Sequence, residues 1–122
     1  MNYEAVGLLG KFSKFTEHFR PKVVAQMNDV QFKVVRVLGD FVWHAHEETD
    51  ETFLILEGSL VIEFRDGSVE LQAGDLFVVP KGREHRPRAA AECKIVLIEP
   101  AGTVNTGNAE RQQLTAPDDV WI

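Results

Sequence analysis

The stretch FVWHAHEETDETFLILEG, residues 41–58, holds two of the four histidines of the chain. Its first part alternates like a β-strand, in which residues i and i+2 project from the same face. His44 and His46 are therefore expected to share one face of a strand. After an acidic turn, Glu51 opens a second strand and shares a face with Phe53. Two imidazoles and a carboxylate that converge on an apolar interior form a set that binds a transition metal well.

The other side chains of this stretch suggest a pocket and a covered outer surface. Strand position alone predicts that the pocket is lined by Val42, Phe53, Ile55, Phe77 and Val79. Phe41 and Trp43 are expected to face away from the histidines. Exposed aromatic patches usually mark interfaces. We therefore expect a partner subunit or the terminal segments to cover these two rings, and the chain is predicted to form a homodimer.

Length and composition indicate one ordinary globular domain. The chain has 122 residues, of which 44% are hydrophobic and 26% charged, so it can bury a core without disulfides. It has no apolar run near the ~20 residues of a membrane span and no signal-peptide pattern. We expect a cytoplasmic protein that does not bind membranes. A net charge of −6 disfavours nucleic acid as a partner, because nucleic acid requires a basic face.

Cys93 and His18 also have reactive side chains, and both are expected to have structural rather than chemical roles. Cys93 is the single cysteine, so an internal disulfide is excluded. It lies in the apolar strand ECKIVLIE and is expected to be a small buried hydrophobe. His18 is expected to be a surface or packing histidine rather than a metal ligand.

Along the chain, a short helical segment precedes a series of strands. Apolar residues in positions 1–20 approach a helical stripe, and Arg20-Pro21 ends it. Strands are expected at 22–26, 32–38, 60–65, 68–72, 76–79 and 92–99, besides the two of the opening stretch. Asp66-Gly67 predicts a hairpin with a type I′ turn. Such spacing indicates an all-β sandwich or barrel in residues 22–100 of a single domain, 1–122. Residues 1–21 would form a helix or arm, and 101–122 a tail on the outside.

A second stretch, GDLFVVPKGREH at residues 74–85, places a third histidine after a proline–glycine turn. From that position His85 can aim back into the mouth of a barrel. Basic residues surround it, namely Lys81, Arg83, Arg86 and Arg88. They form either a solvated loop that keeps a tight turn soluble or a surface that guides an anionic ligand to the barrel.

Together the two stretches resemble the two motifs of the cupin superfamily. The first motif, G-x5-H-x-H-x3–4-E-x6-G, is matched by Gly39, His44, His46, Glu51 and Gly58. The second, G-x5-P-x-G-x2-H-x3-N, is matched by Gly74, Pro80, Gly82 and His85. Two positions depart from the pattern: four residues separate Gly39 from His44, and Ala89 replaces the asparagine. The whole chain also looks like small single-domain cupins that are often labelled sugar-phosphate-isomerase-like without an assigned substrate.

The resemblance implies a jelly-roll (double-stranded β-helix) barrel with one divalent transition metal inside it. The implied ligands are His44, His46, Glu51 and His85. Glu48 and Asp50 compete as the carboxylate, but family spacing and strand parity favour Glu51. The metal is Mn, Fe, Co, Ni, Cu or Zn.

Two functions remain open. The first is a metal-dependent dioxygenase or isomerase acting on a small anionic or polar molecule, and an isomerase would need a base such as Glu84. The second is a non-catalytic cupin that binds or senses a small molecule.

Overall fold

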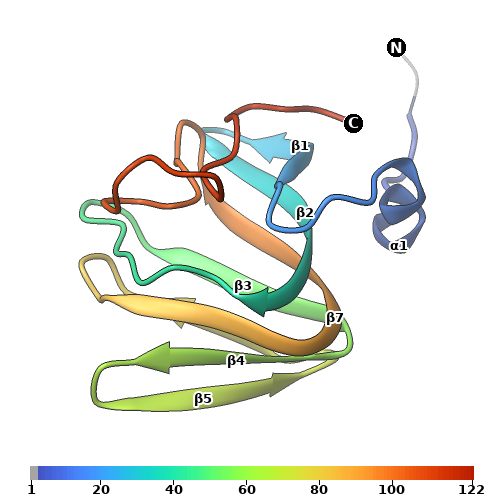
Figure 1. The fold of residues 1–122 in the computed structure, drawn as a ribbon. Helices are drawn as coiled ribbons and strands as arrows, with labels where there is room; N and C mark the ends of the chain where they lie inside the picture. The colour runs from blue at the N-terminus through green and yellow to red at the C-terminus, as the bar shows by residue number, and fades with distance from the viewer. Residues whose placement is uncertain (1–2) are drawn as a thin grey trace.

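The computed structural model describes residues 3–122, which form a mostly antiparallel β-barrel with one short α-helix at the N-terminus (Figure 1). The strands of this part of the chain are β1 (Lys22–Met27), β2 (Val30–Asp40), β3 (Glu51–Glu57), β4 (Ser59–Phe64), β5 (Gly67–Gln72), β6 (Leu76–Val79) and β7 (His85–Pro100). The large sheet has the order β1-β2-β7-β3-β6, and β4 pairs with both β5 and β7. The predicted all-β jelly-roll class is confirmed.

Strand β7 connects the two layers of the barrel. Its first residues pair with β4, in the register Phe64 opposite His85. Farther along, it pairs with β2 on one side and with β3 on the other. The interior between the layers is filled by alternating side chains, because every second residue of a strand points inward. The fully buried members include Val37, Ile55, Leu60, Ile62 and Ile95.

The N-terminal segment packs against the outside of the large sheet. It consists of α1 (Leu8–Lys11) and a 3₁₀ turn (Phe12–Lys14), and α1 lies beside β2 (Figure 1). Phe12 and Phe15 are buried in an outer apolar cluster with residues of β1, β2 and β7. The Arg36 guanidinium donates hydrogen bonds to the carbonyl oxygens of Phe12 and Phe15, at 2.6 and 3.0 Å. The expected short helix is confirmed.

The histidine stretch differs from the prediction, because residues 41–50 form a loop and not a regular strand. The pairing of β2 shifts register between Val37 and Gly39, and Gly39 has φ of +82°. This irregularity turns the chain, so the expected alternation of faces fails. Phe41 points into the barrel and is only 6% exposed.

The two aromatic rings of this loop are covered by the chain itself. The Phe41 ring stacks on Phe19 of the N-terminal segment, with centroids 4.9 Å apart. The Trp43 ring is half-buried under the guanidinium groups of Arg65, 3.8 Å away, and Arg86, 5.2 Å away. The expectation that Phe41 faces away from the histidines was wrong, and two arginines cover Trp43 in place of a terminus. The homodimer stays a prediction.

The β4–β5 hairpin is present, but its turn is not the predicted type I′. Gly67 already pairs with Phe64, so the two turn residues are Arg65 and Asp66. Neither Asp66 nor Gly67 has the positive φ that a type I′ turn requires.

The tail after β7 has no regular secondary structure and folds back over one end of the barrel. Asn105 donates hydrogen bonds to the carbonyl oxygens of Phe19 and Leu114. Asn108 exchanges two hydrogen bonds with the backbone of Ala45. The last residue, Ile122, packs in the outer apolar cluster. Among residues 3–122, no helix has the length and apolar character to span a membrane.

Candidate metal centre

The structure brings the four predicted ligand residues together inside the barrel. Each offers one donor atom, and these atoms all lie within 4.8 Å of one another. His44 and His46 come from the loop after β2, Glu51 begins β3, and His85 begins β7. All four side chains are buried. Backbone hydrogen bonds in both directions join His44 to His85, at 3.1 and 2.9 Å, and hold the two motifs in register.

Backbone carbonyls orient two of the imidazoles. Nδ1 of His44 lies 2.9 Å from the oxygen of Val42, and Nδ1 of His85 lies 2.9 Å from the oxygen of Arg83. A carbonyl oxygen can only accept, so each Nδ1 carries the proton. This tautomer leaves the lone pair of each Nε2 free for a metal, which is the usual arrangement around a histidine ligand.

The cluster also contains a buried polar atom without a partner. Nε2 of His46 has no hydrogen-bond partner within the described part of the chain, and it lies 3.4 Å from Oε2 of Glu51. Oε1 of Glu51 lies 3.2 Å from Nε2 of His85. A buried polar atom that lacks a partner is costly. A cation between these donors would satisfy it, so the residues present fit a metal.

The pKa shifts in the cluster arise from burial and from the contacts between its members. Burial, followed by the nearby His85, lowers the pKa of His44 to about 4, so its imidazole is neutral at neutral pH. Burial acts against the charge of Glu51, but the close imidazoles of His46 and His85 outweigh it and lower the pKa of Glu51. At His46 burial acts to lower the pKa, and the Glu51 carboxylate reverses this and raises it. Three nitrogens and one anionic oxygen suit a divalent transition metal.

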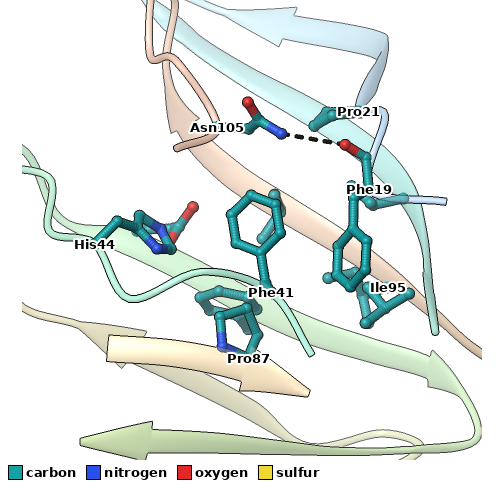
Figure 2. A pocket seen from close by; sticks show the side chains of 12 residues that line it. Phe19, Pro21, Phe41, His44, Pro87, Ile95 and Asn105 are labelled. Carbon is teal, nitrogen blue, oxygen red and sulfur yellow. Dashed lines mark hydrogen bonds between the residues drawn. The ribbon is translucent and has the colours of Figure 1, made fainter. Parts of the chain in front are cut away.

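A small cavity adjoins the cluster. The volume within it that the centre of a water molecule can reach is about 30 Å³. His44 lies on one side of it (Figure 2), Glu51 also lines it, and most of the remaining wall is apolar. Of the predicted lining residues only Phe53 reaches this cavity. The others pack in the core beside it, namely Val42, Ile55, Phe77 and Val79.

Other residues of the wall were missed, among them Phe19, Phe41 and Asn105. These three come from the chain ends and the irregular loop. The Phe41 ring lies edge-on to His44, with centroids 5.3 Å apart. Strand alternation had placed Phe41 on the opposite face, and no local pattern brings residues 19 and 105 together.

A buried contact between a lysine and a glutamate behind Glu51 was also missed. Lys33 and Glu99 are 3% and 2% exposed, and Nζ of Lys33 lies 3.4 Å from Oε1 of Glu99. Thr52 of β3 lies opposite Ile98 of β7, and Glu99 is the next residue after Ile98. Glu99 therefore lies opposite Glu51 on the neighbouring strand. Burial, and then the charge of Glu51, raise the pKa of Glu99 to about 8. The alternation of side chains along a strand could have predicted that both residues are buried, since Lys33 points to the same side of β2 as the buried Val35.

Two of the four basic residues around His85 are engaged with carboxylates. Arg86 and Arg88 contact Oε1 of Glu63, at 2.8 and 3.3 Å. Arg83 and Lys81 are exposed.

Glu84, the candidate base, is exposed on the outside of the barrel and pairs with Arg65. The hydrogen bond from Arg65 lowers the pKa of Glu84, which makes it a weaker base.

The two structural interpretations hold. The ring of His18 lies outside the barrel and its Nε2 is 2.8 Å from Glu92. Cys93 is fully buried in the core cluster. Burial, and then the charge of Glu57, raise the pKa of its thiol to about 11.

Comparisons with known proteins agree with this fold. The model of the cupin domain family Cupin_2 matches residues 34–99. A cupin-2 domain containing protein from Shewanella frigidimarina NCIMB 400 has 55% identity and a TM-score of 0.77, over 78% of this chain and 93% of that one. Protein NMB1881 from Neisseria meningitidis has 34% identity and a TM-score of 0.73, over 80% of this chain and all (100%) of that one.

Among curated sequences, the uncharacterized protein YdbB of Bacillus subtilis (strain 168) is 37% identical over 77 residues. These residues cover 62% of this chain and 68% of YdbB. The family match spans all four candidate ligands, from His44 to His85. The chain therefore belongs to the cupin domain family.

Proposed function

We propose that the chain is a metal-dependent enzyme that binds one divalent transition metal through His44, His46, Glu51 and His85. Its substrate would be a small molecule that presents a polar or anionic group to the metal, in a dioxygenase or isomerase reaction. The observation that carries the proposal is the unsatisfied Nε2 of His46, in a buried cluster whose donor atoms lie within 4.8 Å.

The residues of the site have separable tasks. The bound metal would supply Lewis acidity or activate dioxygen. The Val42 and Arg83 carbonyls hold the His44 and His85 rings with Nε2 directed to the centre. The apolar wall beside the cluster excludes water, which strengthens electrostatic interactions at the reacting group.

Of the two reactions, the surroundings support oxygenation better. An isomerase needs a proton acceptor, and Glu84 is engaged with Arg65 on the outer surface. A sugar phosphate would also need partners for its hydroxyls, which the apolar wall provides poorly. A non-catalytic ligand-binding cupin is the second candidate, because the same four ligands can simply hold a small molecule on the metal.

Metal analysis of the purified protein tests the site. We expect close to one transition metal per chain, and His46→Ala should lose most of it while it keeps its circular dichroism spectrum. His18→Ala is the matched control, because this histidine is half-exposed and bonded to Glu92 outside the barrel. Unchanged metal content in His46→Ala would overturn the assignment.

Oxygen uptake then separates the functions. Protein loaded with iron or manganese is offered small phenols and hydroxy acids in an oxygen electrode. Uptake that His46→Ala abolishes supports oxygenation, whereas saturable binding without turnover under any condition supports the binding cupin.

A further inference from the structure

We infer that Phe19 occupies the place of the ligand's apolar body, and that the natural ligand joins a metal-binding head to a compact apolar body such as one aromatic ring. This inference rests on the proposed metal site and extends it to the chemistry of the whole ligand.

The residues that line the cavity determine which chemistry the body of the ligand can have. The polar side chains of the wall are few, namely His44 and Glu51 of the metal cluster and the amide of Asn105. The rest is mostly aliphatic and aromatic and includes Val35, Val37, Phe53, Ile95 and Leu97. A ligand held in this space would leave most hydroxyl or charged groups of its own unpaired, except at the metal cluster. An apolar body is therefore the chemistry that the wall recognises.

The present cavity is too small for such a body. Room of about 30 Å³ for a water centre accommodates about one or two waters, not a six-membered ring. Part of the wall has to move before a ligand enters. Most of the wall belongs to strands whose ladders hold it in place.

Phe19 is a part of the wall that lies outside the strands, so no strand ladder holds it. It belongs to the segment before β1, and its ring fills the space next to Phe41, with 9% of its surface exposed. Two hydrogen bonds hold its backbone. Its N–H donates to the oxygen of Arg36 at 2.9 Å, and its carbonyl accepts from Nδ2 of Asn105 at 3.1 Å (Figure 2).

The backbone of Phe19 is also strained. Its φ is +59°, in the left-handed region that bulky L residues rarely adopt. Such strain persists only where surrounding contacts impose it, and it often accompanies ligand clamps. Release of Phe19 relieves the strain and opens the cavity at the same time.

A separate cleft also touches the candidate metal cluster, and its chemistry differs from that of the cavity. A surface cleft of about 390 Å³ runs between the loop at 45–49 and the tail at 100–108, and His46 lines it. Its wall includes Glu47, Glu48 and Asn108, so a ligand that used this cleft would be polar and independent of Phe19.

Two hydroxamates test the inference, because they share the chelating head and differ only in the body. Acetohydroxamate carries a methyl group and benzohydroxamate a phenyl ring. Affinities for cobalt-loaded protein are measured by calorimetry and by the visible spectrum of Co²⁺. From wild type to Phe19→Ala, the preference for benzohydroxamate over acetohydroxamate should rise about tenfold, as expected when a ring gains apolar contacts.

Phe15→Leu is the matched control, since Phe15 lies in the same segment but packs on the outer face of the sheet. It should leave the preference unchanged. Should Phe19→Ala fold poorly, two milder variants replace it. Phe19→Leu should give a smaller rise, and Asn105→Ala, which frees the Phe19 carbonyl, should speed benzohydroxamate association.

The outcomes separate the two proposals. If neither hydroxamate binds the cobalt-loaded wild type, the open metal site itself is wrong. If both bind and the preference stays constant in every Phe19 and Asn105 variant, the metal site stands and the inference is overturned in favour of the cleft beside His46.

Discussion

Replacement of Gly107 by alanine should destabilise the protein through contact with the histidine loop. A Cβ at this position would lie 2.4 Å from the carbonyl oxygen of Ala45 and 3.2 Å from Cδ2 of His44. The Ala45 oxygen cannot turn away freely, because it accepts a hydrogen bond from the N–H of Asn108. Displacement of packed backbone costs about 1–3 kcal/mol. The φ of Gly107, +52°, adds roughly 1–2 kcal/mol for an L residue.

Gly102→Ala is the matched control for this experiment. Gly102 also has a positive φ, +88°, but a Cβ there would meet nothing within 4 Å. It should carry the conformational cost alone, so the two variants should differ by about 1–3 kcal/mol. At about 2.1 cal/mol/K per residue, the 122 residues convert 1 kcal/mol into about 4 °C of Tm. Gly107→Ala should therefore melt about 4–12 °C below Gly102→Ala.

Calorimetry of the metal-free proteins measures the difference. Chelator competition then measures metal affinity, which should be weaker in Gly107→Ala because the displaced loop carries His44 and His46. Equal Tm values, within about 2 °C, together with equal affinities would refute the close packing of the tail on the histidine loop.

Three further predictions concern protonation. Metal affinity, measured by dye competition, should be at least about tenfold weaker at about pH 5.5 than at about pH 7.5, because the Glu51 carboxylate raises the pKa of His46 and a protonated imidazole does not bind a metal. Retention of metal at about pH 4 would contradict a histidine site. In metal-free protein, burial and Glu51 raise the pKa of Glu99 from 4.5 to about 8, so the folded state keeps a proton that the unfolded chain loses. The free energy of unfolding should therefore fall as pH rises between these values, and urea titrations of Glu99→Gln should lack that part of the fall; parallel profiles would refute it. Because burial raises the pKa of Cys93 to about 11, iodoacetamide should label it only after unfolding by urea, and rapid labelling of native protein, seen by mass spectrometry, would contradict its burial.

The ligand set could be predicted from sequence because it depends on motif spacing more than on local conformation. His44 and His46 were expected on one face of a strand, yet they lie in a loop and still converge. Backbone pairing between His44 and His85 positions the loop histidines, and the spacing of the two motifs determines that pairing. Glu51 was favoured partly by parity with Phe53 in a regular strand, where parity is reliable.

The cavity wall could not be predicted in the same way. Phe19 and Asn105 are 86 positions apart and meet only because both chain ends fold over the same end of the barrel. No periodic pattern records such a contact. Phe41 was assigned to the wrong face because alternation holds only in a regular ladder, and the irregularity after Val37 ends the ladder before this residue.

Strand β7 has a consequence for the order in which the protein is made. It pairs with β2, β3 and β4, and all three leave the ribosome before it. Until residues 85–100 emerge, the central positions of both layers are vacant and the earlier strands expose unpaired edges. Such long-range pairing is slow to form, and domains tend to fold as units during synthesis. The loop histidines and Glu51 therefore wait for His85, at the start of the last strand, and the metal is expected to enter a barrel that has already closed.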